Sequence, residues 1–366
     1  MGTARGEGAG GIRALGEIWL EVLLADPAVG GGAGGAVCSP AGLWMALCAL
    51  EAGAEGATRR ELRGIVGPDA SGDAAVRELR RGGVITSATG LTGPGGASSA
   101  TGVLVNEVGL EARWERPFEP LFTRAIAFTD ARGLTHDVPA MVAEVPVEDA
   151  WTVAREHGRV TVVELRARSG DGAATTPAAP PARVRFALGE NPQVPPAEVI
   201  AASWTPAAEG TPIRGSRSRH GRHPEAILLE LPRLTLCGDV DVSPLLAAIG
   251  AESLLSPSAE LPEFPGVFPE RPYQGRTVQR CFVRFDEEGL TSEATAEAAE
   301  AAEATEAAEH RTPERSWTDG PGQLLRTVPV RLDRPFAVAV LDGRGTVPLL
   351  AGYQAERPGS PPARTR

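Results

Sequence analysis

The sequence contains no lysine, so all 36 of its basic residues are arginines. It contains 47 acidic residues, and the net charge is −11 at pH 7. Because phosphate binding requires a concentrated positive surface, this charge argues against nucleic acid as a partner. The chain also lacks an apolar run of about 18 residues, so we expect neither a membrane-spanning helix nor a membrane partner.

The usual catalytic and metal-binding motifs are missing as well. We find no Gly-x-Ser-x-Gly, no His-Glu-x-x-His and no phosphate-binding glycine loop. His220 and His223 lie close together, but no third metal ligand is near them in the sequence. The arginine-rich run that contains them, 213–223, is interpreted as a solvated loop, with polyanion binding as the alternative. The sequence therefore predicts a protein that is not an enzyme and has no metal or cofactor.

Cysteines are few, and an export signal is not apparent. Cys38, Cys48, Cys237 and Cys281 lie in apolar segments without metal-ligand spacing, so we expect buried free thiols. Residues 1–12 are rich in glycine and lack the basic start and apolar middle of a secretory signal. We expect this segment to be disordered, and the missing signal indicates the cytoplasm.

Helices and strands can be assigned from periodicity and end signals. Arg13–Ala25 places its apolar residues on one helical stripe. Ser39 is a predicted N-cap with Pro40 in the first turn of the following helix, and Thr58 and Glu61 have the spacing of a capping box. The other predicted elements are strands over 102–106, 159–165, 182–188, 328–340 and 347–353, a strand pair over 227–236 that is interrupted at Pro232, and a helix over 242–249 that ends at Gly250.

One stretch differs from the other predicted strands, because its alternating pattern continues beyond a glycine with different side chains. Val278–Phe285 alternates as a strand and stops at two glutamates and a glycine, Glu287, Glu288 and Gly289. The run from Leu290 to Ala298 keeps a period of two, with a small, mostly apolar face opposite a polar face. This pattern fits a strand buried between two others. It fits an exposed helix equally well, because Ala and Glu are strong helix formers.

This stretch resembles the hinge of the serpins, the serine-protease inhibitor fold. Motifs in the same order along the chain support the resemblance, which is to a divergent, prokaryotic-type member with a shortened N-terminal half and a long reactive loop. These motifs are Ser39-Pro40 before an apolar helix, Asn106 followed by Trp114, Pro117 and Phe118, Leu231-Pro232-Arg233, and Pro335-Phe336.

The resemblance implies an α+β fold with mixed β-sheets and helices packed around them. Only 67 positions separate Ser39 from Asn106 (106 − 39), so we expect a fold reduced on its N-terminal side. The implied organisation is one domain over 13–357, with an exposed reactive loop at 290–327 and a disordered tail at 358–366.

The resemblance also implies a function, inhibition of a serine or cysteine protease by a monomer that is often extracellular in this family. The loop is cleaved, and its N-terminal part enters the main sheet as a strand. Both hinge glutamates would anchor the preceding strand, and Gly289 would be a pivot through its free dihedrals. The alternative is a non-inhibitory scaffold or binding protein with an Ala/Glu-rich arm. The implied hinge comprises Glu287, Glu288, Gly289, Leu290, Thr291, Ser292, Glu293, Ala294, Thr295 and Ala296, and the implied sheet-opening cluster comprises Ser39, Asn106 and Gln279.

Three features depart from the family pattern or leave alternatives open. Leu290 is bulky where the family prefers Thr, and Gln279 stands for a His. The loop is long, with 46 positions from Gly289 to Pro335 (335 − 289), so counts from its two ends place the cleaved bond differently. The candidate residues at this bond are Glu303 and Ala304 from the hinge side, Leu324 and Leu325 from the other side, and Arg311, Arg315 and Arg326 for a trypsin-like protease.

Overall fold

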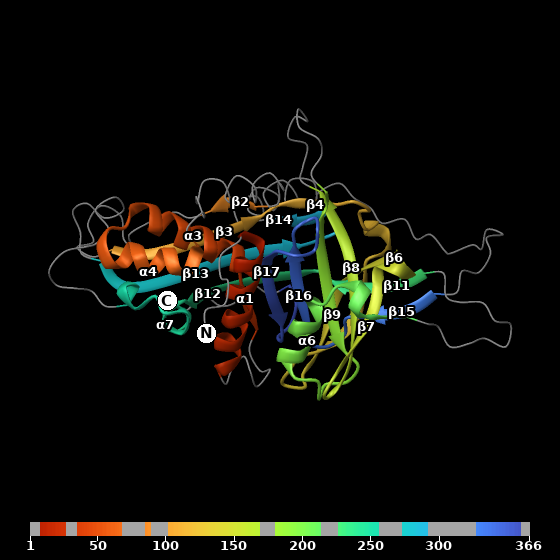
Figure 1. Ribbon diagram of the computed structural model, residues 1–366. Helices are drawn as coiled ribbons and strands as arrows, with labels where there is room; N and C mark the ends of the chain where they lie inside the picture. The colour runs from red at the N-terminus through yellow and green to blue at the C-terminus, as the bar shows by residue number, and fades with distance from the viewer. Residues whose placement is uncertain are drawn as a thin grey trace, which may run out of the picture.

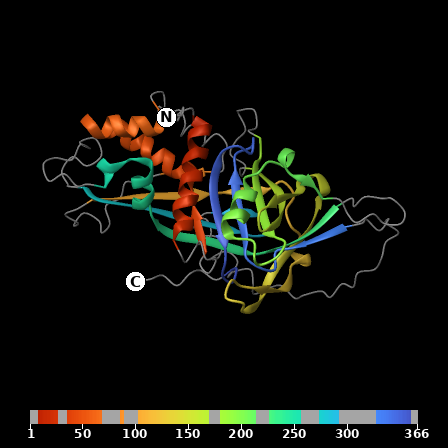
Figure 2. The ribbon, with the colours of Figure 1, turned by 60° about the horizontal axis from the view of Figure 1, so that its bottom comes forward.

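The computed structural model describes residues 8–26, 35–67, 85–88, 102–168, 180–213, 226–255, 273–291 and 327–359. Within these residues, the strands form a sheet of 13 and a second sheet of four. Helices α3, α4 and α7 lie beside the long strands β3, β12 and β13 at one end of the molecule, α1 lies near the middle beside β17, and α6 lies with β7 to β9 toward the other end (Figures 1 and 2). The mixed sheets and surrounding helices confirm the predicted α+β class.

The N-terminal helices are α1 (Gly8–Ala25), α3 (Pro40–Gly53) and α4 (Gly56–Val66). Helix α1 starts inside the segment 1–12 that we expected to be disordered, because Ile12 is buried in the core. Ser39 caps α3 as predicted, since its hydroxyl accepts a hydrogen bond from the Gly42 backbone N–H at 3.0 Å.

The capping box predicted for α4 is wrong. The N-cap is Glu55, so Thr58 lies inside the helix and is buried. The Glu61 carboxylate instead accepts a hydrogen bond from the Ser253 backbone N–H at 3.0 Å, a contact across 192 positions of sequence. Tertiary packing rather than local capping therefore decides where this helix begins.

The 13-stranded sheet has two halves. Parallel pairing of β3 (Gly102–Leu110) with β13 (Tyr273–Phe285) forms the centre of the first half. Its outer strands are β2 (Ile85–Ala88) and β12 (Leu234–Asp241). The other half consists of β1 (Ala36–Cys38), β7 (Ala150–Arg155), β8 (Gly158–Arg168), β9 (Ala182–Gly189), β10 (Thr211–Pro212), β16 (Phe336–Leu341) and β17 (Pro348–Gln354). The short strands β4 (Ala112–Trp114) and β14 (Gly289–Thr291) join the two halves.

The four-stranded sheet has the order β15, β11, β6, β5. Its strands are β5 (Arg124–Thr129), β6 (Thr135–Pro146), β11 (Ala226–Pro232) and β15 (Thr327–Arg331). The prediction of one strand over 328–340 is therefore wrong, because β15 and β16 belong to different sheets. The chain leaves β15 at the fully buried Leu332 and reaches β16 after Pro335, which has no N–H for a ladder.

Short helices complete the described chain. Helix α7 ends at Gly250, which is left-handed with φ 79°, as predicted for a C-cap glycine. The short helices are α6 (Pro196–Ser203), α7 (Ser243–Ile249) and the 3-10 turns η2 (Pro120–Phe122), η3 (Val147–Asp149), η4 (Ala207–Glu209) and η5 (Glu252–Leu254). Among the described helices, none is long and apolar enough to cross a membrane.

The four cysteines are free thiols, as predicted. Cys38, Cys48 and Cys281 are buried, whereas Cys237 is partly exposed. Burial raises the pKa of the Cys38 thiol to about 12. Burial, with the nearby Glu51 carboxylate, raises the pKa of Cys48 to about 12. Three of the thiols are therefore packing groups of the core.

Candidate functional site

The hinge begins with a tight turn between β13 and β14. The Asp286 N–H donates to the Gly289 carbonyl at 3.1 Å. The Asp286 carboxylate accepts hydrogen bonds from the backbone N–H groups of Glu288 at 3.0 Å and Gly289 at 3.2 Å. Aspartate side chains commonly stabilise turns by this contact with the next residues. The turn reverses the chain, so β14 runs back along β13.

Strand β14 fills a fork between β13 and the β3–β4 segment. β13 pairs directly with β3 as far as Phe282 and Gly109. Beyond that point Leu290 of β14 lies between them, opposite Phe285 on one side and Ala112 on the other. Both pairings are antiparallel, so a continuation of β14 in its own direction would run between β3 and β13.

Gly289 makes a close backbone approach to β4. Its φ is not in the left-handed region, and its role as a pivot stays a prediction. A Cβ at this position would overlap the carbonyl oxygen of Ala112 and lie 2.8 Å from Cα of Arg113. Glycine therefore allows the hinge backbone to approach β4.

Glu287 is the buried anchor of the turn. Its carboxylate accepts hydrogen bonds from Arg233 Nη2 at 2.7 Å, Arg233 Nε at 2.9 Å and the Thr123 hydroxyl at 2.5 Å. Burial by itself would raise the pKa of this carboxyl, but the bonds from Arg233 and Thr123 outweigh it and hold the pKa below its ordinary value. The expectation that both glutamates anchor the turn holds for Glu287 alone, because the Glu288 side chain is exposed.

The predicted aromatic motif closes around the same turn. The Trp114 backbone N–H donates to the Glu288 carbonyl, and its indole N–H donates to the Asp286 carbonyl, each at 2.8 Å. The Phe118 N–H donates to the Glu287 carbonyl at 2.9 Å. Trp114 also stacks on Phe285, with ring centroids 6.3 Å apart. Backbone and side-chain bonds therefore fix three consecutive turn residues.

The first two residues of the loop follow the predicted alternation. Leu290 is fully buried on the core side, and Thr291 is partly exposed. Burial in the fork explains how a bulky residue is accommodated at Leu290. The remaining predicted hinge residues, Ser292, Glu293, Ala294, Thr295 and Ala296, and the scissile-bond candidates Glu303, Ala304, Arg311, Arg315, Leu324, Leu325 and Arg326 lie outside the described residues.

The predicted sheet-opening cluster lies at the β3–β13 seam. The Ser39 N–H donates to Gln279 Oε1 at 2.7 Å, and Gln279 Nε2 donates to the Ser39 carbonyl at 3.0 Å. The Ser39 hydroxyl donates to the Leu349 carbonyl at 2.5 Å. Gln279 is the register partner of Asn106 on β3, whose side chain is outside the described part. The amide of Gln279 suits this place because it supplies both a donor and an acceptor.

Thr123 and Asp286 were not predicted, and Arg233 was noted only as part of a motif. Arg233 and Glu287 are 54 positions apart, so no local spacing indicates their pairing. The Asp-Glu-Glu-Gly sequence of the turn could have indicated Asp286, since Asp and Gly are common turn residues.

Among the described residues, Glu156, His157 and Glu198 have donor atoms close enough to share a metal ion, within 4.8 Å of one another. His157 Nδ1 and Glu198 Oε1 are already hydrogen-bonded at 2.6 Å and join the β7–β8 hairpin to α6. The absence of a metal remains a prediction.

Comparison by sequence finds no matching family model and no matching curated protein. Solved structures match over most of the chain. Arabidopsis AtSerpin1, in a native stressed conformation, has a TM-score of 0.62 and 14% identity, covering 97% of this chain and 99% of its own. Native protease nexin-1 with heparin has a TM-score of 0.61 and 14% identity, covering 95% and 98%.

Human thyroxine-binding globulin, complexed with its ligand, is similar to the same extent. It has a TM-score of 0.62 and 14% identity, covering 94% of this chain and 98% of its own. The order of strands, the fork at β14 and these matches over nearly the whole length agree with one another, and the chain has the serpin fold.

Proposed function

We propose that the protein inhibits a serine protease by cleavage of the loop after Gly289 and insertion of its N-terminal part into the large sheet. The observation that carries this proposal is the position of β14. Its three residues already form a strand in the fork and run antiparallel to β13 and β4. Further residues of the loop would extend this strand along the β3–β13 seam.

Insertion has a favourable balance of backbone hydrogen bonds. The incoming strand must separate β3 from β13, which are joined by one parallel ladder. It then forms two ladders, one with each neighbour, and both are antiparallel. Antiparallel pairing is slightly more stable per residue, and each backbone hydrogen bond contributes about 1 kcal/mol net. The uncut protein would therefore be held in a less stable state by the intact loop.

The residues of the hinge would have separate tasks in this reaction. Glu287 and Arg233 hold the turn in place. Insertion would therefore start at Leu290 and would leave β13 in its position. The Gln279 side chain ties β13 to the start of α3. We infer that β13 stays with the helices while β3 moves away from it.

A non-inhibitory binding protein is the second candidate. The observation in its favour is the likeness to thyroxine-binding globulin, whose structure is a complex with a small molecule. The bulk of Leu290 also favours it, because a side chain buried in the fork resists movement of the hinge.

The deciding experiment is incubation with a panel of trypsin-like and subtilisin-like proteases. An inhibitor gives an adduct that survives SDS, and the melting temperature of the nicked protein rises well above that of the intact protein. Ala294→Arg should still be cleaved but should lose both effects, because a long charged side chain cannot enter between packed strands. If no protease of the panel gives an adduct and nicking leaves the melting temperature unchanged, inhibition is rejected in favour of the binding scaffold.

A further inference from the structure

A second buried carboxylate lies near the hinge, on β11. The Glu230 side chain is 3% exposed and accepts hydrogen bonds from Arg331 Nε at 2.6 Å and Nη2 at 3.1 Å. It also accepts one from Arg124 Nη2 at 2.5 Å. Both arginines are about half exposed, so the carboxylate is enclosed while the cations reach solvent.

Two chain segments, 123–124 and 230–233, take part in the contacts of both Glu230 and Glu287. Thr123 donates to Glu287, and the next residue, Arg124, donates to Glu230. Glu230 itself lies three positions before Arg233, which donates to Glu287. We call these six residues the double clasp: Thr123, Arg124, Glu230, Arg233, Glu287 and Arg331.

The two strands that flank the loop are held by the two halves of this double clasp. Glu287 fixes the turn that leads into β14, where the chain enters the loop. Arg331 ends β15, where the chain leaves it. β14 and β15 belong to different sheets, so no backbone ladder joins them. Among the described residues, the double clasp connects these two anchors through charged side chains.

The C-terminal anchor also has backbone restraints, because the N–H of the buried Leu332 donates to the Glu230 carbonyl at 3.0 Å. β15 is the edge strand of the small sheet and pairs with β11 over five residues. Pro329 lies in its middle and is exposed, as is usual for proline on a free edge. A charge-assisted hydrogen bond to Arg331 is roughly twice as strong as a single neutral hydrogen bond of this ladder.

We propose that Glu230 is a positioning residue that couples the two ends of the loop. It ties β15 to Arg124, and the adjacent Thr123 holds the hinge turn, so the two anchors loosen together rather than independently. This inference rests on the proposed function for its purpose, since a loop with both ends fixed presents a constant span to a protease. The coupling itself can be measured without a protease.

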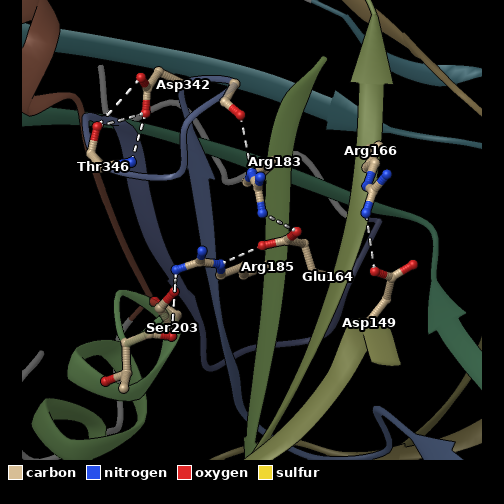
Figure 3. A network of polar contacts seen from close by, with 10 residues as sticks. Asp149, Glu164, Arg166, Arg183, Arg185, Ser203, Asp342 and Thr346 are labelled. Atoms are coloured by element: carbon tan, nitrogen blue, oxygen red, sulfur yellow. Dashed lines mark hydrogen bonds and ion pairs between the residues drawn. The ribbon is translucent and has the colours of Figure 1, made fainter. Parts of the chain in front are cut away.

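The chain offers a matched control for the loss of a buried carboxylate. Glu164 on β8 is 5% exposed and is also held by two arginines, Arg183 at 3.0 Å and Arg185 at 2.8 Å. Arg185 in turn donates to the carbonyls of Ser203 and Thr205. Figure 3 shows this network on β8 and β9 and at the end of α6, among elements that do not flank the loop. Glu164→Gln therefore reports the general cost of removing such a charge.

The test is hydrogen exchange, followed by mass spectrometry, on the uncut full-length protein. In Glu230→Gln we expect exchange to rise by roughly tenfold or more in peptides covering both β15 and the turn 286–289. In Glu164→Gln these two peptides should exchange as in the parent. If Glu230→Gln does not fold, Arg331→Gln serves instead, since Arg124 still pairs the carboxylate.

Two results would overturn the proposal. A rise at β15 with an unchanged turn means that the two carboxylates act independently. An unchanged β15 means that Glu230 does not hold the anchor. Either result leaves loop insertion open to its own test, because adduct formation and the melting temperature of nicked protein are measured separately.

Discussion

Leu290 is paired with Phe285 across the β13–β14 ladder, and the side chains of both residues are fully buried. The start of the loop is thus part of the hydrophobic core in the uncut protein. Leu290, the residue from which the proposed insertion would start, therefore already contributes to the stability of the fold.

Shortening this side chain should destabilise the protein. For Leu290→Ala we expect a loss of about 2–5 kcal/mol in the free energy of unfolding, because a buried leucine leaves a cavity. Leu134→Ala is the control, since Leu134 is 57% exposed and should change stability little. Urea denaturation of both variants checks the prediction, and equal effects would contradict the burial of Leu290.

A methyl group at the hinge glycine should be costly. Gly289→Ala places a Cβ against the Ala112 carbonyl, so we expect a loss of about 1–3 kcal/mol or more. Gly64→Ala is the matched control in α4, where nothing lies within 4 Å of the added Cβ and alanine favours a helix by about 0.5–1 kcal/mol. The melting temperature should fall for Gly289→Ala and rise for Gly64→Ala. An unchanged melting temperature in Gly289→Ala would contradict the close approach of the Gly289 backbone to β4.

Acid should release the Glu287 anchor. The pKa of Glu287 in the folded protein lies below its ordinary value of 4.5, so its stabilising contribution is present above that value. The contribution is lost as the pH falls through the folded pKa, because the protonated acid no longer pairs with Arg233. We expect Glu287→Gln to be less stable than the parent near neutral pH and to lose less stability on acidification. Parallel pH dependences of the unfolding free energy would contradict this role.

The thiols should differ in reactivity. Cys237 is partly exposed, while burial raises the pKa of Cys38 and Cys48 to about 12 and so suppresses their thiolates. Alkylation of the native protein at pH 8 should therefore modify Cys237 first, and unfolding should expose all four. Peptide mapping identifies the modified residue; early labelling of Cys38 would show that β1 is not packed as described.

Much of the local structure could be predicted because it depends on neighbouring residues. Ser39 caps its helix and Gly250 ends another, since each signal acts within one turn. The motif of Trp114 and Phe118 was identified by resemblance, but only the structure shows that it is bonded to the hinge turn. The capping box at Thr58 failed because Glu61 has a distant partner, Ser253.

By itself, the sequence determined several of the helices and strands, their order, and the stop of the strand before Gly289, because these follow from periodicity and from residues close together. Only the tertiary structure decided that Glu287 meets Arg233, that Gly289 lies against Ala112, and that the chain after the loop divides between two sheets. Those outcomes depend on which distant segments pair in a sheet or enclose a charged side chain. Residues close together in the sequence do not indicate whether a carboxylate is buried or which backbone segments come into contact.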